Sequence, residues 1–267
     1  MQKGLEMDQK YNTIIYDKEE RIVKITLNRP ESRNSISKEM SKELNSALLH
    51  AKEDKDVGAI IITGAGSAFC SGIDLKSFHG MTGLENLEFL HKFYSEMIDI
   101  QTHLGKPTIA AINGPVLAAG CSIAFSCDVI IASEKARIGY PEINVGLMPA
   151  LHLVMVPRLI SRHRGFELLF TGDIITAEQA NSLGLINRAV PHDKLDQEAF
   201  DLAKKFASKS PLIVKIMKDR YYQLADVEYC KAVSSVIDAS GVLVTSEDTK
   251  EGMKAFAEKR PPIWKGK

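Results

Sequence analysis

The feature that most constrains this 267-residue chain is a stretch of small and apolar residues from Pro107 to Ser133. Its first part is apolar and rich in β-formers, and it ends at the turn signal Asn113-Gly114-Pro115. Residues 118–126 are small enough for a buried helix, and Val129-Ile130-Ile131 then predicts a short buried strand. The stretch therefore predicts a strand, a tight loop, a short helix and a second strand.

A helix that begins directly after such a loop can bind a negatively charged group. Its first N–H groups have no partner within the helix, and the positive end of its dipole points the same way. Small residues at this point allow a ligand to approach the backbone closely. A donor of this kind can hold a developing oxyanion and is typically worth ~3–4 kcal/mol in a transition state. The alternative is a buried helix between two core strands with no chemical role.

Charge and composition exclude several classes of protein. The chain has 34 Lys and Arg against 34 Asp and Glu, and its hydrophobic content is 45%. A nucleic-acid groove and an anionic membrane surface both attract clustered basic charge, so neither is the expected partner. No apolar run approaches the ~20 residues of a membrane span. The first twelve residues lack the apolar segment of a signal peptide, which predicts a cytoplasmic protein.

The four cysteines are expected to be free thiols in a reducing compartment, because they stand among apolar or small residues without metal-ligand spacing. They are Cys70, Cys121, Cys127 and Cys230. The sequence accordingly predicts no metal site.

The order of elements predicts an α/β core followed by helices. A hairpin (residues 13–27) precedes a helix capped by Ser37 and a buried strand at residues 57–63. A long amphipathic helix at residues 84–103 precedes the central stretch. The later part is predicted to hold strands at residues 136–138 and 185–190, helices near residues 153–161 and 165–170, a capping box at Thr176 and Gln179, and a helix end at Gly184.

From Asp196 onward the pattern is helical, with further helices expected to begin at Ser210 and Ser246. We therefore divide the chain into a core of residues 1–195 and a C-terminal helical region of residues 196–267. The second region is too small and too amphipathic to stand alone, so it is expected to pack on the core or on another subunit.

Two familiar motifs are present only in part. Gly64-Ala65-Gly66 follows a strand, but Phe69 occupies the place of the third glycine of a dinucleotide-binding fingerprint. The segment from Gly120 to Ala124 resembles a nucleophile elbow around Ser122 but lacks its second glycine. A serine hydrolase would also need a histidine, and His152, His163 and His192 are all candidates; a surface or core role is the alternative for each.

A pair of loops and one carboxylate form a stronger pattern. Residues 69–75 follow one predicted strand and residues 117–120 follow another, so two loops of small residues could supply two backbone N–H groups to one oxygen. Glu142 stands behind Pro141 among apolar residues. A carboxyl group in such surroundings has a raised pKa that suits general acid–base work, whereas a surface Glu after a turn is the alternative.

Together these segments resemble the crotonase (enoyl-CoA hydratase/isomerase) superfamily. The resemblance covers most of the chain. It rests on Asn28-Arg29-Pro30 with Asn34-Ser35, on AIIITGAGSAFCSGIDL (residues 59–75), on IAAINGPVLAAGCSIAFSCDVIIAS (residues 109–133), on PEINVGLMP (residues 141–149) and on FTGDIITAEQANSLGLINRAVP (residues 170–191).

The resemblance implies a spiral of ββα units with a C-terminal helical trimerisation region, assembled as a homotrimer or a dimer of trimers. It implies an acyl-CoA thioester as ligand, with coenzyme A as part of the substrate and no separate cofactor. The N–H groups of Ile73 and Ala119 would hold the thioester oxygen of an enolate. Ile73, Asp74, Leu75 and Lys76 would line the acyl and pantetheine part of the site, with Ala119.

The departures from the family pattern bear on the reaction. Hydratases of the family carry a Glu at the position of Ser122 and a second at that of Glu142, and here only Glu142 is present. A lone Glu142 favours double-bond isomerisation, while Ser122 with a water leaves hydration open. Decarboxylation and a catalytically silent CoA-thioester-binding protein are the remaining alternatives.

Two further departures concern the loops near this position. Ala118-Ala119 replaces the family's usual Gly-Gly but keeps both N–H groups. His152 stands in a run that is usually made of small residues and could enter the acyl pocket. The predicted helix at residues 84–103 and the segment at residues 147–156 are expected to shape an apolar acyl pocket.

Overall fold

The computed structural model describes residues 10–267. Most of the first twelve residues, in which no signal peptide was expected, therefore lies outside the described residues. A six-stranded sheet has the order β1-β2-β3-β4-β6-β9, in which β1 and β2 are antiparallel and every other pair is parallel. The strands are β1 (Ile14–Glu19), β2 (Ile22–Leu27), β3 (Ala59–Gly64), β4 (Thr108–Ile112), β6 (Val129–Ser133) and β9 (Arg188–Val190).

Both faces of this sheet are covered. Neighbouring side chains along a strand point to opposite faces, so their surroundings report on each face in turn. Ile60 and Ile62 of β3 lie in the larger apolar core, which includes α1 (Lys38–Glu53). Ile61 lies in a second core on the other face, against α8 (Leu195–Ala207). Burial on both faces explains why β3 and β4 are continuous apolar runs without alternation.

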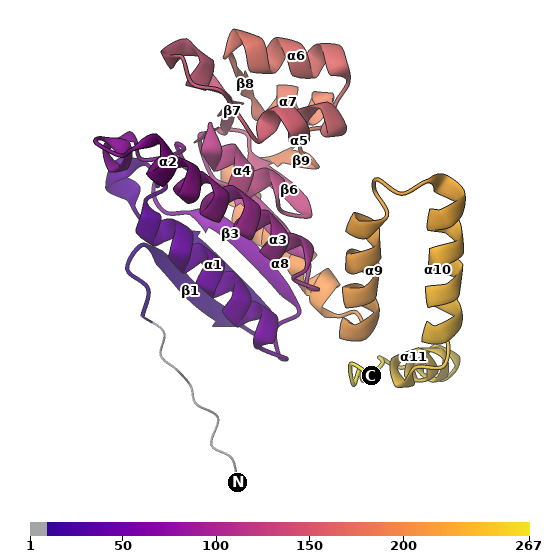
Figure 1. The fold of residues 1–267 in the computed structure, drawn as a ribbon. Coiled ribbons are helices and arrows are strands. Elements are labelled where there is room, and N and C mark those ends of the chain that lie inside the picture. The colour runs from indigo at the N-terminus through magenta and orange to yellow at the C-terminus, as the bar shows by residue number, and fades with distance from the viewer. Residues whose placement is uncertain (1–9) are drawn as a thin grey trace.

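A second, three-stranded sheet stands beside the end of the first and helps to form the candidate site. Its order is β5-β7-β8, with β5 (Val116–Leu117) parallel to β7 (Arg137–Gly139) and β7 antiparallel to β8 (Ile174–Thr176). In Figure 1 the helices α5 (His152–Leu159), α6 (Arg162–Thr171) and α7 (Ala177–Leu183) gather around this sheet. Neither β5 nor β8 was predicted.

The long helix predicted at residues 84–103 is present but is not uniform. It consists of α2 (Gly83–Leu90), a π-helical segment η3 (His91–Glu96) and α3 (Met97–Thr102). A π-helical turn takes in an extra residue and is often found at functional sites. Phe93 in this segment is buried and Tyr94 is half-buried against the larger core.

The predicted helix caps are confirmed. The Ser37 hydroxyl accepts from the Met40 N–H at the start of α1, and Thr176 with Gln179 forms a capping box at α7. Gly184 ends α7 with a φ of 80°. Ser210 and Ser246 cap α9 (Pro211–Gln223) and α11 (Glu247–Ala257) in the same way.

The helices α9, α10 (Tyr229–Leu243) and α11 lie to one side of the sheets (Figure 1). Helix α9 is joined to the core through Asp128, which accepts hydrogen bonds from Lys218 at 2.7 Å and from the Tyr222 hydroxyl at 2.6 Å. Helix α10 was not predicted, and none of its residues is buried. The cysteines are free, as expected, and no helix of residues 10–267 is long and apolar enough to cross a membrane.

The chain end is fixed by a buried carboxylate in α11. Asp248 is fully buried and accepts from the Ser210 hydroxyl at 2.5 Å and from the backbone N–H groups of Lys265 at 2.7 Å and Gly266 at 3.0 Å. The Asp248 N–H donates to the carbonyl of Lys267. One side chain thus joins α9, α11 and the C-terminal tail.

We predict that Asp248→Ala lowers the free energy of unfolding by about 3 kcal/mol, because several buried donors lose their acceptor. Denaturant unfolding followed by circular dichroism measures this change. Asp226→Ala is the matched control, since Asp226 is exposed, and it should stay within about 0.5 kcal/mol of the parent. Equal stabilities of the two variants would show that the Asp248 contacts do not hold the tail.

Candidate active site

The first loop of the site is held by the side chain of Asn34. Its Nδ2 donates to the carbonyls of Ala65 at 2.9 Å and Ala68 at 2.8 Å, and its Oδ1 accepts from the N–H of Arg29 at 2.9 Å. This explains the motif Asn28-Arg29-Pro30 with Asn34: the motif fixes the glycine-containing loop that follows β3. Gly64 and Gly66 serve the packing of this loop: a Cβ on Gly64 would collide with the carbonyl of Ala68, and one on Gly66 would lie 3.0 Å from the Cβ of Pro30.

The two predicted loops meet at Gly72. A Cβ atom on Gly72 would lie 2.9 Å from the Cβ of Ala118, 3.2 Å from the carbonyl of Leu117 and 3.4 Å from the nitrogen of Ala119. Gly72 also has a φ of 100°, which L-residues rarely adopt. Only glycine therefore allows the backbones of the two loops to approach this closely.

The N–H groups of Ile73 and Ala119 are free to bind a ligand. The carbonyl of Gly72 and the N–H of Asp74 both pair with Ile36, so the N–H of Ile73 between them points the opposite way. Ala119 is the first residue of α4 (Ala119–Phe125), where an N–H has no partner inside the helix. Neither N–H bonds to another of residues 10–267.

The remaining predicted binding residues have different surroundings. Asp74 forms an ion pair with Arg29 at 3.0 Å and accepts from the N–H of Lys76 at 3.2 Å. Its carboxylate is thus engaged in holding the loop. Leu75 is 62% exposed and Lys76 is also exposed, so both are accessible to a ligand at the edge of the site.

Glu142 lies in a short 3-10 helix, η4 (Pro141–Val145), directly after β7. Because the Ala118 N–H donates to the carbonyl of Gly139 at 3.0 Å, the end of β7 runs beside the second loop. The Oε2 atom of Glu142 is buried without a hydrogen-bond partner among the described residues. Burial raises the pKa of Glu142, and no neighbouring carboxylate contributes to that shift. These are the surroundings of a carboxyl group that can both take and return a proton.

Ser122 is fully buried and is paired with a histidine that the sequence could not single out. Its Oγ lies 3.1 Å from Nε2 of His152, and the same Nε2 lies 3.2 Å from the carbonyl oxygen of Ala118. The imidazole also packs against the Tyr140 ring, with 4.4 Å between ring centroids. His163 and His192, the other candidates, have no contact with Ser122.

The second contact of His152 assigns its tautomer. A carbonyl oxygen can only accept, so the contact with Ala118 is a hydrogen bond when Nε2 carries the proton; this tautomer also leaves no buried N–H unpaired at Nδ1, which has no partner among the described residues. Burial lowers the pKa of His152 to about 4, despite the opposing effect of this hydrogen bond, so the ring is neutral near pH 7. A protonated Nε2 cannot accept the Ser122 proton, and this argues against a serine hydrolase at the site.

Tyr94 is a site residue that the sequence reasoning missed. It comes from η3 and has a hydrogen-bonding contact with Ser122. Burial, and after it the negative charge of Glu142, raises the pKa of Tyr94 to about 12. A neutral hydroxyl therefore lies close to both Ser122 and Glu142. Only its position in an apolar helix predicted to shape the pocket could have pointed to it.

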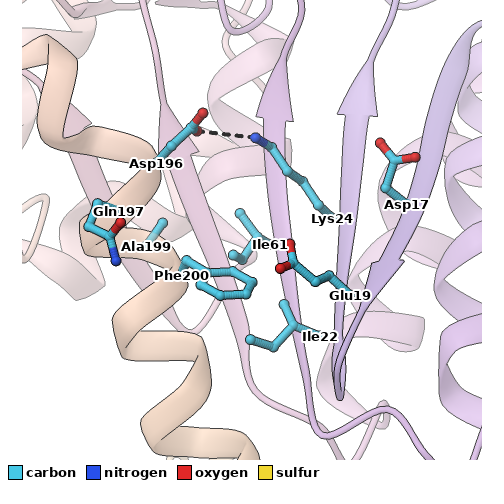
Figure 2. Close-up of a pocket in the computed structure, with 9 residues that line it drawn as sticks. All are labelled: Asp17, Glu19, Ile22, Lys24, Ile61, Asp196, Gln197, Ala199 and Phe200. Carbon is cyan, nitrogen blue, oxygen red and sulfur yellow. Dashed lines mark ion pairs between the residues drawn. The ribbon is translucent and has the colours of Figure 1, made fainter.

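A separate pocket of about 560 Å³ lies on the other face of the main sheet, against α8. Figure 2 shows Lys24 of β2 and Asp196 of α8 reaching toward each other across it, in an ion pair of 3.2 Å. None of the predicted site residues lines this pocket. Ala119 and Ile73 instead pack with the larger core, on the opposite face of the sheet.

The sheet topology and the two loops that meet at Gly72 define a protein of the crotonase fold, as the sequence predicted. The structure superposes with a TM-score of 0.91 on a crystal structure of an enoyl-CoA hydratase from Bacillus anthracis, at 34% identity, covering 96% of this chain and all of that one. A structure of human enoyl-CoA hydratase domain-containing protein 3 has a TM-score of 0.87 at 32% identity, covering 95% and 100% of the two chains.

The chain belongs to the enoyl-CoA hydratase/isomerase family, whose model matches residues 17–267. It is 38% identical to a probable mitochondrial enoyl-CoA hydratase of Dictyostelium discoideum, over 97% of this chain and 93% of that protein. It is 33% identical to a crotonyl-CoA hydratase of Syntrophomonas wolfei, over 94% and 96% of the two chains. These relatives support an enzyme of the hydratase/isomerase type.

We predict that His152 makes the protein less stable in acid. Its pKa is lower in the folded protein than in the unfolded chain, so the unfolded chain binds more protons between about pH 6.5 and 4. The free energy of unfolding should fall across this window by roughly 3 kcal/mol through this group. In His152→Leu that part of the pH dependence should be missing. Urea unfolding of both proteins at several pH values measures the difference, and parallel pH curves would contradict the prediction.

Proposed function

We propose that the protein isomerises the double bond of an enoyl-CoA through a thioester enolate, with Glu142 as the single acid–base group. One observation carries the proposal: Glu142 offers a buried, unpaired carboxylate oxygen beside the second loop, and Ser122 occupies the position of a second carboxylate. A lone carboxylate can lift a proton from one carbon and return it to another, whereas syn-hydration by this family uses a pair.

The proposed reaction is a proton shift through three carbons. Glu142 takes a proton from the substrate, and the electron pair of the broken C–H bond moves through the double bond into the thioester carbonyl. The enolate oxygen accepts hydrogen bonds from the N–H groups of Ile73 and Ala119. When the carbonyl re-forms, Glu142 returns the proton to the other end of the three-carbon unit, and no atom is gained or lost.

Exposed apolar side chains support an apolar acyl group. They come from the two segments expected to shape the pocket: Leu84 and Leu87 on α2 are 76% and 52% exposed, and Leu147 and Met148 after η4 are 48% and 68% exposed. Covering exposed side chains of this size with an acyl chain removes apolar surface from water and so favours binding.

Hydration is the second candidate, and two observations favour it. The relatives named above are called hydratases. In addition, Tyr94 and Ser122 place two neutral hydroxyls near Glu142, where they could hold a water molecule for attack. In this reaction Glu142 would deprotonate that water instead of a carbon.

Assembly as a trimer or a dimer of trimers and a cytoplasmic location stay predictions. Apolar side chains on α10 support the first, since Ile237 and Val242 are 64% and 72% exposed. The relatives include both bacterial proteins and proteins named mitochondrial, so they do not decide between the cytoplasm and the mitochondrion.

Incubation with 2-enoyl-CoA and 3-enoyl-CoA substrates in heavy water, followed by mass spectrometry, tests the reaction. We expect a shifted double bond, with deuterium taken up in those turnovers in which the proton held by Glu142 exchanges with solvent before it is returned. A product that has gained one water would assign hydration, and loss of carbon dioxide from a carboxyacyl-CoA would assign decarboxylation. Binding without any turnover would identify a silent homologue and contradict the proposal.

Glu142→Gln should lower kcat by a factor of ~10²–10⁴, because the amide cannot transfer the proton. Burial raises the pKa of Glu142, so kcat/KM of the parent should fall in acid with a midpoint above 4.5, as the base becomes protonated. Glu134→Gln is the matched control, because Glu134 is exposed and lies outside the site. Full activity in Glu142→Gln would remove Glu142 from the mechanism.

A further inference from the structure

The peptide unit between Ala118 and Ala119 has an unusual conformation. Ala118 has a φ of 52° and a ψ of −132°, the mirror image of an ordinary extended residue. Glycine adopts this conformation readily, but the Cβ of an L-residue is crowded there, at a typical cost of about 1–3 kcal/mol. Rotation of the peptide plane away from this ψ would relieve Ala118.

Such a rotation would change the candidate oxyanion site directly. In a planar trans peptide the C=O of one residue and the N–H of the next point in opposite directions. The direction of the Ala119 N–H is therefore fixed by the direction of the Ala118 carbonyl. Whatever holds that carbonyl also aims the N–H toward the ligand.

The Ala118 carbonyl is held by two groups, the backbone N–H of Cys121 at 2.9 Å and the side chain of His152. The Nε2–H of His152 donates to it at 3.2 Å, from a ring that is 1% exposed. The ring is fixed in turn by the face of Tyr140 and by Ser122, and its backbone N–H donates to the carbonyl of Pro149. This is a buried donor with little freedom to move. A hydrogen bond to the carbonyl also polarises the peptide, which strengthens its N–H as a donor.

We propose that His152 is a positioning residue for the oxyanion site: its hydrogen bond to Ala118, added to the one from the Cys121 N–H, holds the strained peptide so that the Ala119 N–H points at the thioester oxygen. The proposal rests on the proposed function, in which that N–H stabilises an enolate. It gives one reason for two departures from the family pattern, since an alanine at position 118 needs an anchor that a glycine does not need.

The test compares His152→Leu, Ala118→Gly and the double variant with the parent protein. The readout is the infrared carbonyl stretch of an acyl-CoA that carries a ¹³C-labelled thioester carbonyl, measured when bound. This frequency falls as hydrogen bonds to the oxygen strengthen, and it can be measured without turnover. His152→Leu should lose part of the shift of the parent, because only the Cys121 N–H then holds the peptide, and its kcat should fall roughly tenfold with KM nearly unchanged.

The double variant separates positioning from general damage. With glycine at position 118 the peptide is no longer strained, so Ala118→Gly with His152→Leu should regain most of the carbonyl shift and of kcat. His152→Gln, which keeps an N–H donor, should retain part of both and serves if His152→Leu folds poorly. Ser122→Ala keeps the bond between His152 and Ala118 and should therefore keep the carbonyl shift.

Three results would overturn the proposal. A carbonyl shift in His152→Leu equal to that of the parent would show that the histidine does not aim the N–H. Failure of Ala118→Gly to restore the double variant would assign the loss to packing. Loss of the shift in Ser122→Ala would mean that His152 acts through Ser122. If the parent itself shows no shift on binding, the proposed enolate chemistry fails, and the role of His152 fails with it.

Discussion

The structure depends on the contact between two backbone segments at Gly72. The end of the loop after β3 and the start of α4 approach so closely that a single methyl group at Gly72 would collide with Ala118. Gly120 is under the same constraint, since a Cβ there would collide with the carbonyl of Cys70. Because side chains are excluded at Gly72 and Gly120, the two segments meet through backbone groups. In the proposed reaction, backbone N–H groups from these segments bind an oxygen and Glu142 transfers the proton.

Capping residues and long apolar runs predicted most of the fold. The parallel strands of the main sheet are apolar on both faces. Four helices begin at the predicted capping residues Ser37, Thr176, Ser210 and Ser246. Short strands gave no such signal. With two residues, β5 is fixed by its pairing with β7 and not by its own sequence. Helix α10 has no buried residue, so the pattern that marks a core-facing helix is weak there.

The site could be predicted in part. Small residues after two strands predicted the paired loops, and the apolar neighbours of Glu142 predicted its raised pKa, whose direction the structure supports. The environment of Ser122 could not be predicted, because its partner His152 is thirty residues away and its neighbour Tyr94 lies on another helix. The strain at Ala118 could not be predicted either, because an alanine at the start of a buried helix is common and only its φ and ψ reveal the strain.

The π-helical segment η3 has a consequence for how such a protein can change over time. An extra residue in one turn advances the phase of a helix by about 100°, so the side chains before and after η3 follow different registers. The half before it exposes Leu84 and Leu87, and the half after it buries Met97 in the core. Substitutions in the exposed half can therefore accumulate while the buried half keeps its packing.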